Sequence, residues 1–175
     1  MIRVQLSDLT AYRVLDPRWS SSPLSGAGAA KHGGRVNRPG IETLYLALDH
    51  NTAILEYKQL STLLRPGTLV SYQVSVAHVI DFREGYIASS WEPMWQDFYC
   101  DWRELWFNQH IEPPSWAIGD AVIASAAKGI LFKSRYAGGD TNLALYPDAF
   151  TNLESMAVYD PDRLLGKKDP LWGSW

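Results

Sequence analysis

Three side chains with complementary chemistry lie in one short stretch of the sequence, at Arg35, Tyr45 and Glu56. Arg35 follows Gly33 and Gly34, and paired glycines let a backbone approach a ligand closely while the guanidinium binds phosphate oxygens as a planar fork. Tyr45 can stack on a planar ring, and Glu56 can stabilise a cationic ribose. Together these groups could hold a pyrophosphate, an aromatic base and the cation that forms when an N-glycosidic bond breaks.

Each of these residues also has a purely structural interpretation. Paired glycines commonly form turns, and a strand tyrosine between two leucines can be half-exposed without any function. Glu56 has no basic residue three or four positions away, so it is either an ordinary solvated glutamate or one that faces a cleft.

Ser134 follows an apolar segment and precedes a glycine-rich loop, where it can bind a ligand or cap a turn. No histidine lies at a spacing that predicts a hydrolase nucleophile elbow. We therefore interpret Ser134 as a hydrogen-bond partner and not as a nucleophile.

Length and composition predict one globular domain. The chain has 175 residues, of which 46% are hydrophobic and 20% charged, and its net charge of -3 argues against binding nucleic acid through phosphate neutralisation. Cys100 is the only cysteine, and the four histidines lack cysteines or carboxylates at metal-ligand spacing, so we expect neither a disulfide nor a metal site. The N-terminus shows no signal pattern and no apolar run is long enough to span a membrane, which predicts a cytoplasmic protein.

Hydrophobic patterns predict an α+β fold with a mixed, mainly antiparallel sheet. Alternating or β-branched segments predict strands over 11–15, 43–48, 68–76, 130–133 and 156–159. Helical spacing predicts a turn over 27–31 and helices over 52–60, 94–108 and 118–128, with Asp49 or Asn51 as a cap and Gly129 as a stop. We expect one catalytic domain over 1–160 and an irregular, partly mobile tail over 161–175.

Tryptophan is unusually frequent, with eight in the chain, and it is concentrated between Trp91 and Trp116. The helical spacing of the aromatic residues over 95–106 predicts a broad apolar stripe. Such a stripe usually packs in the core, and any excess could face a protein partner.

Six short motifs occur in order along the chain and are followed by Ser134: Tyr12-Arg13-Val14, Pro23-Leu24-Ser25-Gly26-x-Gly28-Ala29, Gly33-Gly34-Arg35-x-Asn37, Leu44-Tyr45-Leu46-Ala47, Ala53-x-x-Glu56 and Trp116-x-x-Gly119-Asp120. Over residues 11–160 this set resembles the RES-domain family, the toxins of RES/Xre type II toxin–antitoxin systems. The resemblance implies a compact α+β fold like that of bacterial ADP-ribosyltransferase toxins. It also implies NAD⁺ as a consumed substrate without a metal, and a hetero-oligomeric complex with an Xre-type antitoxin.

The resemblance further implies roles for individual residues. Glu56, Arg35 and Ser134 would form the catalytic set, with Glu56 stabilising the ribose cation. The implied NAD⁺-binding residues are Arg13, Arg35, Asn37, Tyr45 and Ser134. Arg13 and Arg35 would hold the pyrophosphate, Tyr45 would stack on a ring, and Ser134 would bond the nicotinamide ribose or amide.

Two features favour transfer of ADP-ribose to a host protein, as in the similar ParT-like toxins. The aromatic segment 91–106 exceeds what a nucleotide pocket requires and could dock a protein acceptor. Val36 stands where the family usually has an aromatic residue, which would open one side of the pocket. A second departure from the family pattern is Lys133, which precedes Ser134 where the family usually has a proline. The alternatives are an NAD⁺ glycohydrolase or phosphorylase without a protein acceptor, and a non-catalytic module that binds nucleotide or protein.

Overall fold

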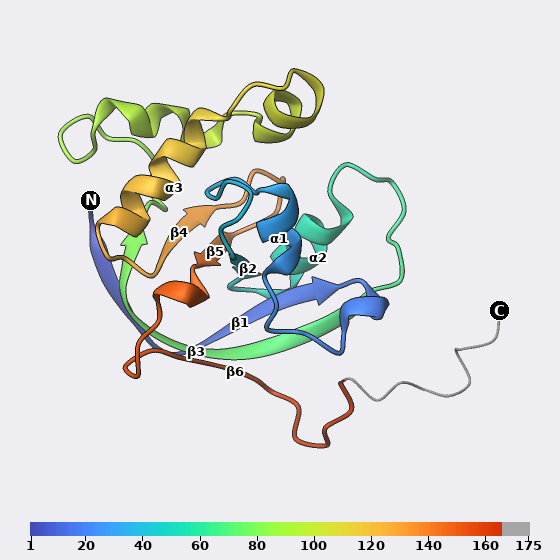
Figure 1. Ribbon diagram of the computed structural model, residues 1–175. Coiled ribbons are helices and arrows are strands. Elements are labelled where there is room, and N and C mark those ends of the chain that lie inside the picture. Colours follow the sequence, from blue (N-terminus) through green and yellow to red (C-terminus); the bar gives the residue numbers. More distant parts are fainter. Residues whose placement is uncertain (166–175) are drawn as a thin grey trace.

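Two long strands form the framework of the molecule. In the computed structural model, which describes residues 1–165, β1 (Arg3–Leu15) and β3 (Thr68–Asp81) pair antiparallel and curve together along the bottom of Figure 1. Both strands extend beyond their predicted ends. In β3 the reason is that buried Val79 and Ile80 continue the apolar face beyond the predicted end, past His78, whose φ is 57°.

The sheet closes on itself through four further pairings. The remaining strands are β2 (Leu44–Ala47), β4 (Gly129–Lys133), β5 (Thr141–Leu145) and β6 (Ser155–Val158). The order of the six strands in the sheet is β1-β2-β5-β4-β3-β6, and β1 also pairs with β3. Among the described strands, β3 and β4 are the one parallel pair. The mainly antiparallel sheet confirms the predicted α+β class; β5 is the strand that the pattern did not predict.

In the described part of the chain, three α-helices cover the sheet: α1 (Ala27–His32), α2 (His50–Lys58) and α3 (Pro114–Ala124). Asp49 caps α2, as predicted, by accepting a hydrogen bond of 2.9 Å from the backbone N–H of Thr52. The predicted boundaries of the third helix are wrong, because Pro114 starts it early and it ends before Ala126, whose φ is 60°. Gly129 begins β4. Short 3-10 turns occupy Pro17–Trp19 (η1) and Pro147–Ala149 (η4).

The predicted helix over 94–108 is wrong: this segment forms the 3-10 helix η2 (Pro93–Tyr99) and the π-helix η3 (Glu104–Asn108). The chain leaves the helical path at Cys100, whose φ and ψ are -54° and 157°. The break has a physical cause, since the carbonyls of Phe98 and Cys100 turn aside to accept hydrogen bonds from Arg35.

The aromatic residues pack in the core. Trp91, Trp95 and Phe98 are at most 5% exposed and surround Phe82, whose ring centroid lies 4.6–4.9 Å from theirs. The same cluster includes Ile118 and Val122 of α3 and Ile130 of β4, so it joins the sheet to α3, which lies above the sheet in Figure 1. A second cluster, which includes Val74 and Leu143, fills the inside of the closed sheet. These aromatic residues are therefore not available as a surface stripe that could contact a protein partner.

Residues 166–175 of the predicted irregular tail lie outside the described residues. Within residues 1–165, no helix is long and apolar enough to cross a membrane.

Candidate functional site

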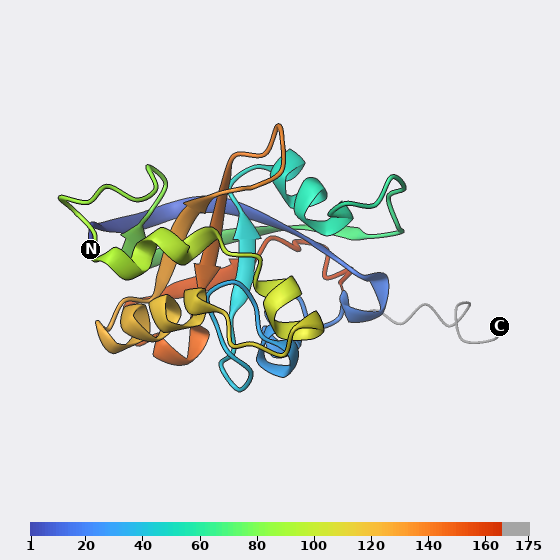
Figure 2. The ribbon, with the colours of Figure 1, turned by 90° about the horizontal axis from the view of Figure 1, so that it is seen from above.

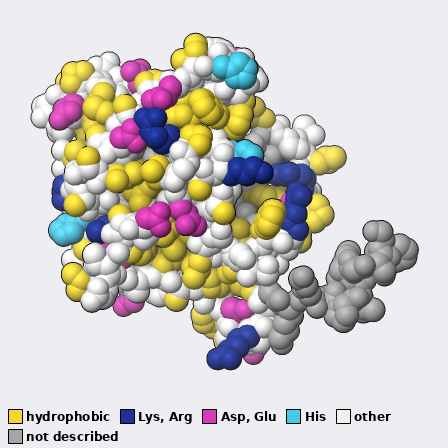
Figure 3. Space-filling model, viewed as in Figure 1, with side chains coloured by type: hydrophobic (Ala, Val, Ile, Leu, Met, Phe, Trp, Pro, Cys, Tyr) yellow, Lys and Arg dark blue, Asp and Glu magenta, His cyan; other side chains and the backbone are white. Residues whose placement is uncertain are grey.

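A cavity of about 640 Å³ opens between α1 and α2. In Figure 2 these two helices lie near opposite ends of β2. A space of this size suits a small organic ligand. Of the residues predicted from the sequence, Arg13, Arg35, Tyr45 and Glu56 line it. Figure 3 shows Lys and Arg side chains gathered beside a hollow on this side of the molecule.

Glu56 is fixed by two donors from the sheet. Its Oε1 accepts hydrogen bonds from Ser134 Oγ at 2.8 Å and from Asn142 Nδ2 at 2.5 Å. Ser134 directly follows β4, and Asn142 lies on the neighbouring strand β5. Within residues 1–165, no side chain bonds the second carboxylate oxygen. The carboxylate is thus oriented from behind and keeps one oxygen for the cavity.

The start of α2 is tied to the same loop. The Thr52 hydroxyl donates to Asp49 and accepts a hydrogen bond of 2.7 Å from the backbone N–H of Asp140. Because Asp140 precedes β5, this contact sets the position of the helix that carries Glu56 relative to the strand that carries Asn142.

Arg35 is held by the aromatic segment. Its Nη1 donates to the carbonyls of Phe98 at 3.0 Å and Cys100 at 3.2 Å, and its guanidinium lies 5.6 Å from the Tyr99 ring centroid. Burial and the nearby positive charge of Arg135 lower the pKa of Arg35. An arginine remains charged at neutral pH despite such a shift, so it presents a preoriented cation to the cavity.

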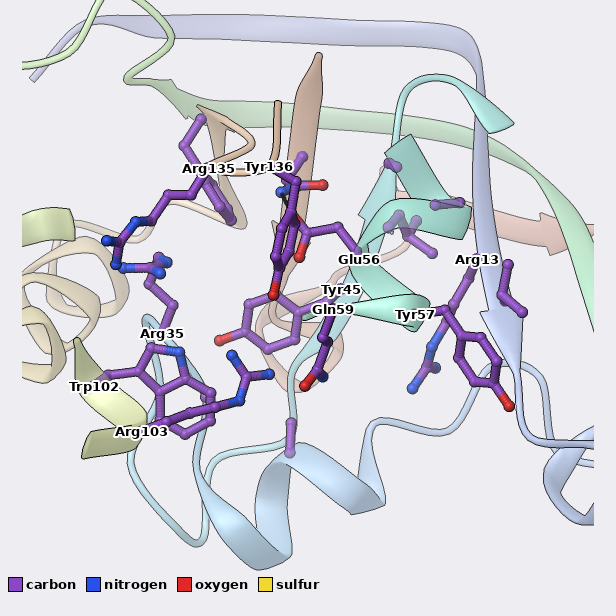
Figure 4. A pocket seen from close by; sticks show the side chains of 18 of the residues that line it. Arg13, Arg35, Tyr45, Glu56, Tyr57, Gln59, Trp102, Arg103, Arg135 and Tyr136 are labelled. Carbon is purple, nitrogen blue, oxygen red and sulfur yellow. Dashed lines mark hydrogen bonds between the residues drawn. The ribbon is translucent and has the colours of Figure 1, made fainter. Parts of the chain in front are cut away.

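Two further arginines lie beside Arg35 and were not predicted from the sequence (Figure 4). Arg103 lies over the Trp102 ring, 4.5 Å from its centroid, and Arg135 donates a hydrogen bond of 3.1 Å to the Tyr99 carbonyl. In the described part of the chain none of these three arginines forms an ion pair. We call Arg35, Arg103 and Arg135 the arginine cluster; its unpaired charge suits an anion.

Arg13 lies on the other side of the cavity. It donates a hydrogen bond of 3.0 Å to the Ser25 carbonyl, and burial lowers its pKa. In Figure 4 Arg13 and Arg35 lie on opposite sides of Glu56. Both arginines line the same cavity, and their assignment to the pyrophosphate stays a prediction.

Tyr45 forms part of the cavity wall and braces the loop behind it. Its hydroxyl donates to Asn37 Oδ1 at 2.8 Å and accepts from the backbone N–H of Val36 at 3.1 Å. Burial raises the pKa of Tyr45, so its hydroxyl stays protonated at neutral pH. A side chain on Gly34 would lie 2.4 Å from this hydroxyl, which explains the glycine before Arg35.

Asn37 and Val36 face away from the cavity. Asn37 is 1% exposed, and its amide nitrogen donates to the carbonyls of Ala29, Arg38 and Ile41. Its polar atoms are thus used inside the protein, and we interpret it as a residue that positions Tyr45. Val36 is 0% exposed and packs in the core, so the expectation that it opens one side of the cavity is wrong.

The tertiary structure adds residues that the sequence did not reveal. Asn142 lies on the strand that was not predicted, and the cavity is also lined by Gln59, Arg103, Arg135 and Tyr136. Among these added residues, only Arg135 had a signal in the sequence that it lies near the site, because it directly follows Ser134. Arg103 carried no such signal, because only the break at Cys100 directs the following residues toward the cavity.

Comparison with known proteins agrees with the motif pattern. The family model of the RES domain matches residues 10–165. Among solved structures, the chain is similar to one described as the M. tuberculosis MbcT-MbcA toxin-antitoxin complex, with 19% sequence identity and a TM-score of 0.58. The match covers 91% of this chain and 87% of that chain. No curated protein matches the chain. At this identity the structural likeness establishes a shared fold.

Proposed function

This chain belongs to the RES-domain family, and on that premise we propose that it is a toxin that cleaves NAD⁺ between nicotinamide and ribose. The observation that carries the proposal is the placement of Glu56. Its carboxylate is oriented by Ser134 and Asn142 and faces a cavity lined by Tyr45 and several arginines.

In the proposed reaction, the bond between ribose C1 and the nicotinamide nitrogen breaks first. The electron pair of that bond neutralises the positive ring and leaves an oxocarbenium-like ribose. Glu56 lowers the energy of this cation by charge, and because its donors fix it beforehand, little reorganisation is needed in the transition state. The arginines bind the phosphate oxygens of the dinucleotide, and Tyr45 contacts a ring.

The acceptor of the ADP-ribosyl group is the next question, and the sequence favoured a host protein. Both features behind that preference are weakened, since Val36 is buried and most aromatic residues of segment 91–106, among them Trp91 and Trp95, are buried as well. We therefore favour a small acceptor. Water would give ADP-ribose and release a proton, whereas phosphate would give ADP-ribose phosphate. Arg13 and the arginine cluster together carry four positive charges against the two negative charges of the dinucleotide pyrophosphate, and the surplus charge supports phosphate as the acceptor.

The products of NAD⁺ labelled on its adenylate group test this assignment. The protein is incubated with the label and a host lysate, with and without added phosphate. We expect free nicotinamide and labelled ADP-ribose, or its phosphate when phosphate is supplied. A discrete labelled protein band that disappears with Glu56→Gln would instead establish transfer to a protein.

An antitoxin partner follows from the same proposal, because unrestrained loss of NAD⁺ would stop growth. The similar solved structure is itself described as a toxin-antitoxin complex. We expect expression of this chain alone to arrest growth, and co-expression of the product of the adjacent gene, an Xre-type protein, to restore growth through a stable complex. Harmless expression of the folded protein would contradict the toxin assignment.

A further inference from the structure

Gln59 has an unusual backbone conformation beside the cavity. It is the C-terminal cap of α2, three residues after Glu56, and its φ and ψ are 55° and -133°. The backbone N–H of Ser61 donates to the carbonyl of Lys58 at 3.2 Å, which closes a four-residue turn around Gln59 and Leu60. Gln59 therefore occupies the first central position of a type II′ turn.

This position strongly favours glycine. At positive φ the β-carbon of any other residue crowds the backbone, and the ψ of Gln59 is far from the small left-handed region that side chains tolerate. Strain of this kind persists where the surroundings impose it, and it is concentrated at ligand-binding and catalytic sites.

The capping role does not explain why glutamine occupies the position. The cap bond runs from the Gln59 backbone N–H to the Leu55 carbonyl, at 2.8 Å, and glycine would form it equally well. Within residues 1–165 the Gln59 amide forms no hydrogen bond, and the residue is exposed. The side chain thus contributes nothing visible to the fold of the described chain.

The side chain does line the cavity. In the view of Figure 4 it lies between Arg103 on one side and Tyr57 and Arg13 on the other. An amide offers both a donor and an acceptor, which is the combination that two adjacent hydroxyl groups of a ribose require. The charged groups around it suit the phosphates to which such a ribose is joined.

We propose that Gln59 is a substrate-contacting residue whose amide binds ribose hydroxyls of the dinucleotide and sets specificity for that sugar. The inference rests on the proposed function, since it assigns part of the same substrate. The strained turn holds the amide in the cavity at the end of the helix that carries Glu56, so one helix would present both groups to the substrate.

The test compares Gln59→Gly with Gln96→Gly, an exposed glutamine in η2 outside the cavity. Relief of strain predicts that Gln59→Gly raises the melting temperature by about 2 to 4 °C, whereas Gln96→Gly lowers it. Loss of the ribose contact predicts that Gln59→Gly raises KM for NAD⁺ about 5- to 10-fold with kcat changed less than about 3-fold. Gln96→Gly should leave both constants unchanged.

A binding measurement separates this inference from the proposed reaction. ADP-ribose has no nicotinamide bond to cleave, so its dissociation constant is measurable by calorimetry in every variant. We expect Gln59→Gly to weaken ADP-ribose binding about 5- to 10-fold, whether or not the wild type releases nicotinamide. Equal ADP-ribose affinity in the wild type and Gln59→Gly would overturn the role of Gln59. Gln59→Asn, with a shorter amide, should fall between the two.

Discussion

At the scale of single residues, the site depends on how a carboxylate is held. Glu56 receives hydrogen bonds from Ser134 and Asn142, so the Ser134 hydroxyl is used to orient the carboxylate. Ser134 Oγ also accepts a hydrogen bond of 3.2 Å from the backbone N–H of Tyr136, which fixes the hydroxyl itself. This geometry agrees with the interpretation of Ser134 as a hydrogen-bond partner.

We expect Ser134→Ala and Asn142→Ala each to lower kcat for nicotinamide release about 10-fold, with a much smaller change in KM, because the carboxylate would lose its orientation while the binding groups remain. Ser134→Thr keeps the hydroxyl and should restore most of the activity. Steady-state kinetics of the three variants check this expectation. A rise in KM alone would place Ser134 and Asn142 among the substrate-binding groups.

Residue types and spacing singled out Arg35, Tyr45 and Glu56, and the resemblance to the RES-domain family added Arg13; all four line one cavity. The cluster of three arginines could not be predicted, since Arg103 reaches the cavity only because the chain breaks at Cys100. The core positions of Asn37 and Val36 were equally hidden, because a motif gives residue types without the direction in which each side chain points.

At the scale of elements, the loop that carries Arg35 is positioned by α3. Trp116 Nε1 donates to the Gly34 carbonyl at 2.7 Å, and Ser115 Oγ donates to the Arg35 carbonyl at 2.6 Å. Gly119 allows the close approach, because a β-carbon there would lie 2.1 Å from the Val36 carbonyl oxygen. The Trp116-x-x-Gly119 motif therefore has a packing explanation.

We expect Gly119→Ala to lower the free energy of unfolding by about 3 kcal/mol or more, since backbone and not a flexible side chain opposes the added methyl group. Gly28→Ala is the matched control: it also lies in a helix, and its β-carbon meets no atom within 4 Å. That control should be neutral or slightly stabilising. Chemical denaturation of both variants provides the comparison, and equal stabilities would contradict the close packing of α3 on this loop.

At the scale of the whole molecule, the closed sheet separates two cores, and the cavity lies between α1 and α2. The strands were largely predictable from their residue patterns. The closure of the sheet on itself was not predictable, because it depends on pairings between residues far apart in the chain, such as Tyr12 and Ala47. The aromatic spacing over 94–108 predicts one helix because 3-10 and π segments place aromatic residues at similar intervals.

The core position of the aromatic cluster predicts a large difference between two tryptophans. Trp95 is 1% exposed, whereas Trp19 is 62% exposed. We expect Trp95→Ala to cost about 3 to 5 kcal/mol of stability and Trp19→Ala less than about 1 kcal/mol. Denaturation curves measure both values. A small effect at Trp95 would restore the possibility that this segment serves as a docking surface.

The central claim is that Glu56 stabilises the cation formed when the nicotinamide bond of NAD⁺ breaks. The most direct measurement is the rate of nicotinamide release by the wild type, by Glu56→Gln and by the control Glu84→Gln, an exposed glutamate outside the cavity. Glutamine keeps the volume of Glu56 and removes its charge, so we predict a folded variant whose rate falls at least about 100-fold, while the control matches the wild type. A folded Glu56→Gln protein that releases nicotinamide at the wild-type rate would contradict the account.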